Sequence, residues 1–207
     1  MSTHSTDSGS GENRPLRLML ASTVYGFETE LEQIAAVLRA YGYEIWNSHL
    51  GTIRAHPDKS NLENCLIAVQ ECDVFLGIIW PFYGSGKVGQ RSITHEEMLK
   101  AVELVKPRWF LVHDHVTFAR QLLRPFFVTK TGKRKKRPPK FQKTAVMDDL
   151  RVLQMYDDVI QNQIPAADRK GHWAQQFFHL NEALRYIEAN LRDIEVVRRI
   201  CEEMKIR

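Results

Sequence analysis

Apolar residues along the chain fall into two patterns, short unbroken runs and longer stretches with a spacing of three and four. Unbroken runs predict strands buried on both faces, whereas the three-and-four spacing predicts amphipathic helices. The runs lie at residues 16–21, 43–46, 72–80 and 108–112, and the helical stretches that follow them lie at 27–41, 60–69, 94–105 and 116–126. Strands that alternate with helices predict a parallel sheet covered by helices on both faces.

The fold class expected from this order is α/β, with a flavodoxin-like doubly wound parallel sheet and a helical C-terminal extension. The expected divisions are a disordered tail over residues 1–15, an α/β domain over 16–127, a basic loop over 128–143 and the helical extension over 144–207. In sheets of this kind ligands bind beyond the carboxyl ends of the strands. We therefore expect a functional site at that edge.

The extension contains an expected helix over residues 145–161, followed by an apolar seam. The seam consists of Phe177, Leu180, Leu184, Ile187, Leu191 and Ile194, on alternating steps of three and four. Such a seam can pair with another helix as a coiled coil, or it can pack back onto the α/β domain. The first alternative predicts a homo-oligomer, most simply a two-fold dimer.

Composition narrows the compartment and the partners. No run of about 18 apolar residues is present, so the sequence predicts no membrane partner. Its three cysteines, Cys65, Cys72 and Cys201, lack the spacing of a zinc site or a disulfide framework. Sparse cysteines without a disulfide framework are typical of a reducing compartment, and we expect a cytoplasmic protein.

The net charge of +4 comes from one segment. Residues 128–143 hold eight Lys or Arg and no acidic residue, which leaves 21 basic against 25 acidic residues in the rest of the chain. This segment could contact nucleic acid or an acidic surface. Two prolines and a single aromatic residue, Phe141, are more typical of a solvated loop, so a nucleic-acid partner is not expected.

Glu97 is the candidate catalytic residue. The helix that we expect to begin at Thr94 buries a stripe that includes Met98 and Ala101. At 100° per residue, Glu97 lies on the edge of this stripe and Glu96 lies opposite it, in solvent. Glu97 then sits in the first turn, at the rim of the expected pocket. The alternative is that Thr94 and Glu97 form a capping box, in which Glu97 only satisfies a backbone N–H.

Polar, aromatic and glycine residues near the carboxyl ends of the strands are candidates for binding a nucleotide. They are Ser22, Thr23, Trp80, Phe82, Tyr83, Gly84, Ser85 and Ser92. Glycines in the loop over residues 81–91 allow close approach of a ligand, and the aromatic residues could either stack a base or pack in the core. The His-Asp-His triplet at residues 113–115 has no supporting ligand cluster, so no metal is expected.

Four segments together resemble one known family. They are STVYGFETEL, SNLENCLIAVQECDVFLGII, FYGSG and SITHEEMLKA, which begin at residues 22, 60, 82 and 92. As an ordered set they resemble the family catalogued as domain of unknown function 4062, over about residues 16–127. That family is similar to a branch of the TIR-like and nucleoside-deoxyribosyltransferase-like α/β folds.

The resemblance implies a chemistry. In catalytic TIR-like enzymes a glutamate four residues before a small residue, in the helix after the third strand, contacts the ribose of NAD. This glutamate stabilises the positive charge that develops as nicotinamide leaves. Glu97 and Ala101 match that pattern, and Ser22 and Thr23 would lie at the ribose or phosphate end.

The resemblance thus implies a nucleotide-handling protein that cleaves the N-glycosidic bond of NAD or a related nucleotide, in bacterial defence or signalling. NAD would be the substrate and no resident cofactor is expected, while a defence-system protein is a possible partner. The alternative is a non-catalytic module for nucleotide sensing or protein interaction, because the same fold serves both purposes.

Overall fold

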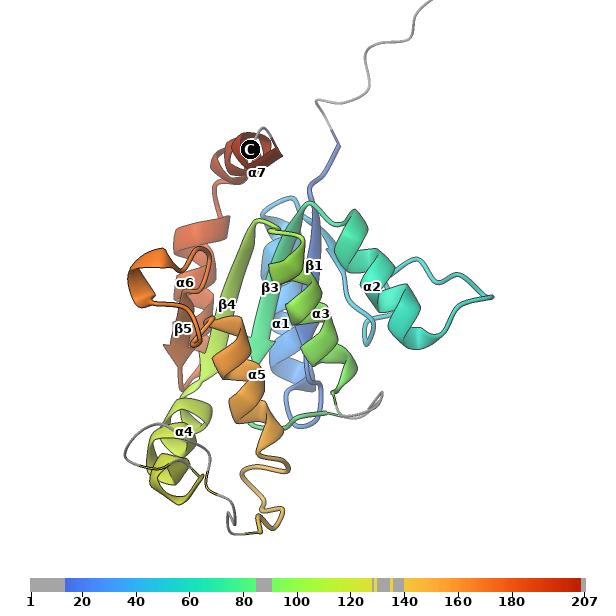
Figure 1. The fold of residues 1–207 in the computed structure, drawn as a ribbon. Coiled ribbons are helices and arrows are strands. Elements are labelled where there is room, and N and C mark those ends of the chain that lie inside the picture. The colour runs from blue at the N-terminus through green and yellow to red at the C-terminus, as the bar shows by residue number, and fades with distance from the viewer. Residues whose placement is uncertain (1–13, 85–90, 128, 130–134, 136–139, 206–207) are drawn as a thin grey trace, which may run out of the picture.

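A computed structural model describes residues 14–84, 91–127, 129, 135 and 140–205. Residues 1–13 of the expected tail, Ser85 and most of the basic loop lie outside the described residues. Arg14, at the end of that expected tail, is instead bonded to Asp73. The sheet has five parallel strands in the order β2-β1-β3-β4-β5 (Figure 1). The strands are β1 Arg17–Ser22, β2 Glu44–Trp46, β3 Val74–Ile79, β4 Arg108–His113 and β5 Ala174–Phe177.

Helices cover both faces of this sheet, which confirms the doubly wound α/β class with C-terminal helices. The helices are α1 Glu28–Ala40, α2 Asn61–Glu71, α3 Ile93–Glu103, α4 Asp114–Phe127, α5 Arg151–Val159, α6 Leu180–Leu191 and α7 Ile194–Lys205, with a short 3-10 turn at Ala166–Asp168. In Figure 1, α3 and α5 lie on the near side of the sheet and α1 on the far side.

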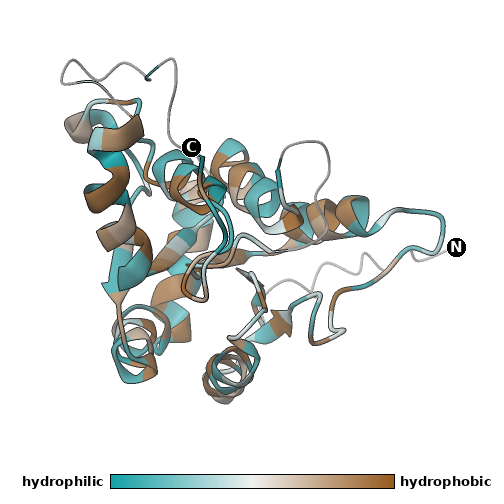
Figure 2. Cartoon of the chain, turned by 90° about the horizontal axis from the view of Figure 1, so that it is seen from below, coloured by the Kyte–Doolittle hydropathy of each residue, from teal (hydrophilic) through white to brown (hydrophobic). Residues whose placement is uncertain are grey.

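Alternate residues of the strands build two cores. Leu76 and Ile78 of β3 face one core, which also contains side chains of α1, α6 and α7. Phe75 and Ile79 face the other core, with side chains of α2, α3 and α5. Burial on both faces explains why this strand is an unbroken apolar run. The helices show the matching division into apolar and polar stripes (Figure 2).

The chain changes sides of the sheet between β1 and β3. From β1 it crosses to β2 through α1, on one face, and from β2 to β3 through α2, on the other. This reversal makes a topological switch point at the carboxyl ends of β1 and β3, where doubly wound proteins bind ligands.

The C-terminal region contributes more than helices. Residues 174–177, where the sequence predicts the start of a helical seam, form β5 and pair with β4. The seam is divided between β5, α6 and α7, and Phe177, Ile187 and Leu191 are buried in the domain core. The seam therefore packs back on the domain, which is the second of the two alternatives. Because β5 belongs to the sheet, the α/β domain extends past the expected boundary at residue 127. The helix expected over 145–161 is limited to α5.

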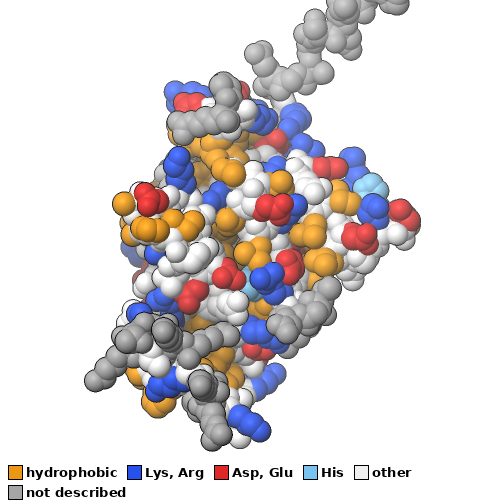
Figure 3. Space-filling view, in the orientation of Figure 1, with side chains coloured by type: hydrophobic (Ala, Val, Ile, Leu, Met, Phe, Trp, Pro, Cys, Tyr) orange, Lys and Arg blue, Asp and Glu red, His pale blue; other side chains and the backbone are white. Residues whose placement is uncertain are grey.

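Among the described residues, no helix combines the length and apolar character needed to cross a bilayer. Acidic and basic side chains are interspersed on the face that Figure 3 presents.

Candidate functional site

The switch point brings together the ends of β1 and β3. Ser22 of β1 pairs with Ile78 of β3. Thr23 directly follows Ser22, and Trp80 directly follows Ile79, the last residue of β3. Thr23 Oγ1 and Trp80 Nε1 are buried and have no hydrogen-bond partner among the described residues. Buried polar atoms without a partner are uncommon because they lose hydration, and they concentrate where water or a ligand binds. The predicted positions Ser22, Thr23 and Trp80 therefore lie at the carboxyl ends of two adjacent strands, as expected.

Gly84, in the loop after β3, lies against Thr23 at the switch point. Its φ is +87°, in the region that favours glycine, and a Cβ there would lie 2.9 Å from Cγ2 of Thr23. The glycine is thus required by close contact with Thr23 of the same chain.

Glu97 lies deeper than the rim position that the helical face predicts. Its side chain is 3% exposed, and burial raises its pKa to about 7, while a hydrogen bond with the Cys65 thiol lowers it. Cys65 belongs to α2, so the carboxyl group lies between α3 and α2. Burial, the charge of Glu97 and the hydrogen bond between them raise the pKa of Cys65 to about 12. Near neutral pH, Glu97 is therefore divided between its protonated and ionised forms.

The start of α3 differs from the expectation. The N-cap is Ser92, whose hydroxyl accepts from the backbone N–H of His95 at 3.3 Å, and the helix begins at Ile93. The alternative in which Thr94 and Glu97 form a capping box is therefore wrong, and so is the expected placement of Glu97 in the first turn. The hydroxyl of Thr94 instead donates to the carbonyl of Ser22 at 3.3 Å. This bond ties the face of α3 that carries Glu97 to the end of β1.

Glu96 faces away from this site, as its position on the helix predicts. Its carboxylate lies 3.5 Å from the guanidinium of Arg91, and about a third of its side chain is exposed.

Tyr83 holds the loop after β3 to two helices. Its ring is fully buried, and its hydroxyl lies 2.8 Å from Nδ1 of His95 and accepts from the N–H of Ser92 at 3.1 Å. Nε2 of His95 lies 3.0 Å from Asp158 on α5. The Asp158 carboxylate can only accept, so Nε2 of His95 carries a proton that points to it. Burial lowers the pKa of His95, and in the neutral ring Nδ1 then accepts from the Tyr83 hydroxyl. The Arg151 guanidinium lies 4.7 Å from the centre of the Tyr83 ring.

Tyr83 and Ser92, which the sequence predicts to bind a ligand, instead bond to other residues of the same chain. The ring of Tyr83 presents no open face for stacking a base in this arrangement, and Ser92 is occupied as a helix cap. Sequence reasoning did not find His95 or Asp158, because 63 residues separate them and only the packing of α5 on α3 joins them.

An aromatic cluster continues from the switch point along the ends of β3, β4 and β5. Trp80 stacks on Phe27 with ring centres 4.5 Å apart and meets His113 edge-on at 4.4 Å. His113 also contacts Phe177 at 5.5 Å. Burial and the neighbouring His115 lower the pKa of His113 to about 4, so this imidazole is neutral near pH 7. One face of Trp80 is therefore covered by Phe27, and Phe82 nearby is half-buried.

His113 and His115 do not belong to a metal centre in the part of the chain that the structure describes, since no group of three His, Cys, Asp or Glu side chains there could hold an ion.

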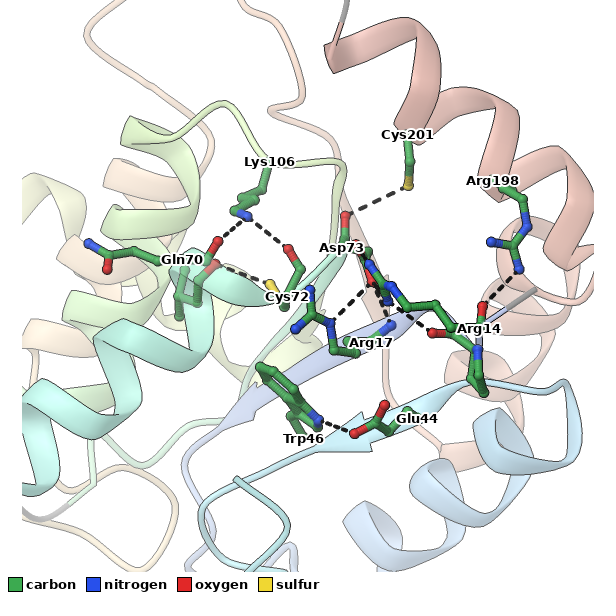
Figure 4. Close-up of polar contacts among 12 residues, drawn as sticks. Arg14, Arg17, Glu44, Trp46, Gln70, Cys72, Asp73, Lys106, Arg198 and Cys201 are labelled. Carbon is green, nitrogen blue, oxygen red and sulfur yellow. Dashed lines mark hydrogen bonds and ion pairs between the residues drawn. The ribbon is translucent and has the colours of Figure 1, made fainter. Parts of the chain in front are cut away.

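The opposite, amino edge of the sheet contains a cavity of about 610 Å³ whose walls are tied together by charge (Figure 4). Both outer guanidinium nitrogens of Arg14 donate to the Asp73 carboxylate at 2.7 Å, and the backbone N–H of Arg17 donates to it at 2.9 Å. Lys106 donates to the carbonyls of Gln70 and Cys72 at the end of α2, at 2.6 and 2.7 Å. A cation at the C-terminal end of a helix is favoured by the helix dipole.

These bonds hold the segments that precede β1, β3 and β4 together, so we assign them a structural role. The cavity of about 610 Å³ thus lies away from the switch point. Four buried side-chain atoms lack a hydrogen-bond partner among the described residues: Thr23 Oγ1 and Trp80 Nε1 at the switch point, and Arg17 Nε and Arg108 Nε at the amino edge. The feature that distinguishes the switch point is therefore the buried carboxyl group of Glu97. We take the switch point as the candidate site for that reason.

The fold and this site define a doubly wound α/β protein with a candidate ligand site at the switch point of its sheet. The family model described as "Domain of unknown function (DUF4062)" matches residues 17–168, and the chain belongs to this family. The match reaches past α5, which agrees with the bond between His95 and Asp158. No curated protein matches the chain.

Proposed function

We propose that this chain is a TIR-like nucleotide-handling protein that cleaves the N-glycosidic bond of NAD or a related nucleotide. The observation that carries the proposal is the Glu97 carboxyl group, buried beside the switch point. Among the described residues no cationic side chain is paired with it, and burial raises its pKa to about 7.

A buried carboxylate without a cation favours a cationic partner, because the partner offsets the loss of hydration. In NAD the nicotinamide ring carries a positive charge. Breaking the glycosidic C–N bond sends its electron pair to the ring nitrogen, and positive charge then develops on the ribose. Ionised Glu97 would stabilise that charge in a site with little water, where a fixed charge acts more strongly than in solution. Water then adds to the anomeric carbon and releases a proton.

The direct test is incubation of the purified chain with NAD and related nucleotides, with released nicotinamide or base measured by mass spectrometry. We expect release by the wild type and by Glu96→Gln, and none by Glu97→Gln. Because the ionised form is the active one, kcat/KM should rise with pH through about 7 and then level off. Full turnover by Glu97→Gln, or no release by the wild type from any nucleotide tested, would contradict the proposal.

A second candidate is a non-catalytic module that senses a nucleotide or contacts a partner. The observation that favours it is the engagement of Glu97 with Cys65, and of Tyr83 and Ser92 with His95, within the fold. Saturable binding of a nucleotide in calorimetry, without product in mass spectrometry, would select this candidate. Either role is proposed for a cytoplasmic protein of bacterial defence or signalling.

Homo-oligomerisation remains part of the proposal, with α4 as the contact. Phe118, Leu122 and Phe126 lie four residues apart on one helical face and are 61%, 56% and 53% exposed. The order Phe–Leu–Phe is the same in both directions. A two-fold axis at Leu122 would therefore pack α4 against its copy, with Phe118 against Phe126 of the partner subunit.

Light scattering coupled to size exclusion tests this contact. We expect a mass of twice the 24.1 kDa of the chain, reduced to the monomer by Leu122→Glu but not by the neighbouring exposed change Gln121→Glu. A wild-type monomer at tens of micromolar, or a dimer unaffected by Leu122→Glu, would contradict it.

A further inference from the structure

A second cavity, of about 400 Å³, lies at the starts of β4 and β5. Because these strands are parallel, Arg108 at the start of β4 and Gln175 near the start of β5 lie at the amino edge, away from the switch point. None of the cavity's lining residues has a role in the proposed function. Its volume is within the lower part of the range for small-molecule sites, roughly 300–1,000 Å³.

Arg108 supplies a positive charge that has no acidic partner in the part of the chain that the structure describes. Its two outer nitrogens donate to the carbonyls of Lys106 at 3.2 Å and Lys170 at 2.9 Å, and its Nε is buried with no partner among the described residues. Burial lowers its pKa, and no carboxylate opposes that shift. A guanidinium has five N–H donors. Arg108 therefore retains free N–H groups after it has donated to the two carbonyls. An uncompensated, partly buried cation is costly and favours an anion beside it.

The approach of the chain to this guanidinium depends on Gly171. Its φ is +59°, and a Cβ there would lie 2.9 Å from Cζ and Nη2 of Arg108. Any side chain at this position would therefore collide with the guanidinium at the wall of the cavity.

The remaining walls are aromatic and amide groups. Trp109, Trp173 and Tyr186 line the cavity together with the amides of Gln175 and Asn190. Trp173 is 67% exposed, which is unusual for so large an apolar side chain, and its indole N–H lies 3.4 Å from the Gln175 side-chain oxygen. Flat aromatic walls beside a guanidinium suit a flat ring that carries a negative charge.

We propose that this cavity binds a small aromatic carboxylate, with the carboxylate on Arg108 and the ring against Trp173 and Tyr186. A carboxylate matches the planar fork of the guanidinium, and the cavity volume fits one or two rings rather than a dinucleotide. The site is separate from the switch point, so its occupancy is independent of the proposed nucleotide chemistry.

The test uses 4-(trifluoromethyl)benzoate as the probe, with the uncharged 4-(trifluoromethyl)benzamide as its matched control, in fluorine NMR titrations of the full chain. For a ligand of this size we expect a dissociation constant of about 1 mM or below. The amide should bind at least about tenfold more weakly, because it loses the charge-assisted hydrogen bonds to Arg108.

Three variants separate binding at this site from general apolar binding. Trp173→Ala removes an exposed side chain, so the fold should persist and binding should weaken about tenfold. Val146→Ala shortens another exposed apolar side chain, which is 52% exposed and has no role in either proposal, and should leave binding unchanged. Arg108→Leu should abolish binding, and if that variant does not fold, the acid–amide comparison and Trp173→Ala still decide. Equal affinity for acid and amide, undiminished binding by Trp173→Ala, or no saturation at millimolar probe would overturn the proposal.

Discussion

The hydroxyl of Tyr83 lies 2.8 Å from Nδ1 of His95, and both side chains are buried. This contact, with the bond from His95 to Asp158, joins the loop after β3 to α3 and α5. It fixes the start of the helix that carries Glu97, so it is a positioning contact for the candidate site.

Tyr83→Phe should lower the free energy of unfolding by about 1–3 kcal/mol, because His95 Nδ1 and the Ser92 N–H would be left buried without a partner. Urea denaturation measures the change. Tyr41→Phe is the control, since the Tyr41 hydroxyl has no hydrogen bond among the described residues, and it should change stability by less than about 0.5 kcal/mol. Equal effects of the two changes would contradict the positioning role.

Glu97→Gln should stabilise the chain at alkaline pH. In the unfolded chain this carboxyl group ionises near its ordinary pKa of 4.5, whereas in the fold it keeps its proton up to about pH 7. The folded state thus binds more protons between these values, and stability falls as pH rises from 4.5 to 7. The variant avoids this loss, which is roughly 3 kcal/mol at pH 8 and close to zero near pH 4.5.

Denaturation of wild type and Glu97→Gln at both pH values checks this, with Glu96→Gln as the matched control. A Glu97→Gln variant that is less stable than wild type at pH 8 would show that the carboxylate supports the fold. Greater stability with loss of turnover is the pattern expected of a functional residue that costs stability.

His113 should give the opposite pH dependence. Its ordinary pKa is 6.5, and burial holds the folded value at about 4. The unfolded chain therefore takes up a proton first as pH falls, and stability is complete above about 6.5 and declines toward pH 4. The loss amounts to as much as roughly 3 kcal/mol.

Comparing His113→Asn with the exposed change His49→Asn at pH 4.5 and pH 8 isolates this contribution. The first variant should lose stability less steeply on acidification than wild type, and the second should follow wild type. Parallel curves for wild type and His113→Asn would mean that His113 is protonated in the folded protein.

Ile187→Ala tests whether the C-terminal seam belongs to the domain core. Ile187 is fully buried against the sheet, so its truncation should cost about 2–5 kcal/mol of folding free energy. This loss of folding free energy should not depend on protein concentration. If the seam joined two chains, the loss would change with protein concentration. Asn181→Ala, at an exposed position of α6, is the control and should be nearly neutral.

The sequence by itself determined the elements whose residues carry their own signal. β3 is apolar throughout, and the helix expected from residue 60 opens there with Ser60 as its N-cap and Glu63 completing a capping box. These elements depend on local periodicity and on contacts within a few residues, which are readable along the chain. The direction in which Glu97 faces was also predictable, because helix geometry sets it.

Only the tertiary structure decided the features that join distant segments. β5 has the sequence AQQF, with no apolar run, and it is a strand because β4 offers an edge to pair with. The depth of Glu97 is set by Cys65 on a different helix, and the burial of Tyr83 by Asp148 and Arg151 more than sixty residues away. Such contacts depend on how helices pack on the sheet, and nothing in the local pattern of residues encodes the partner.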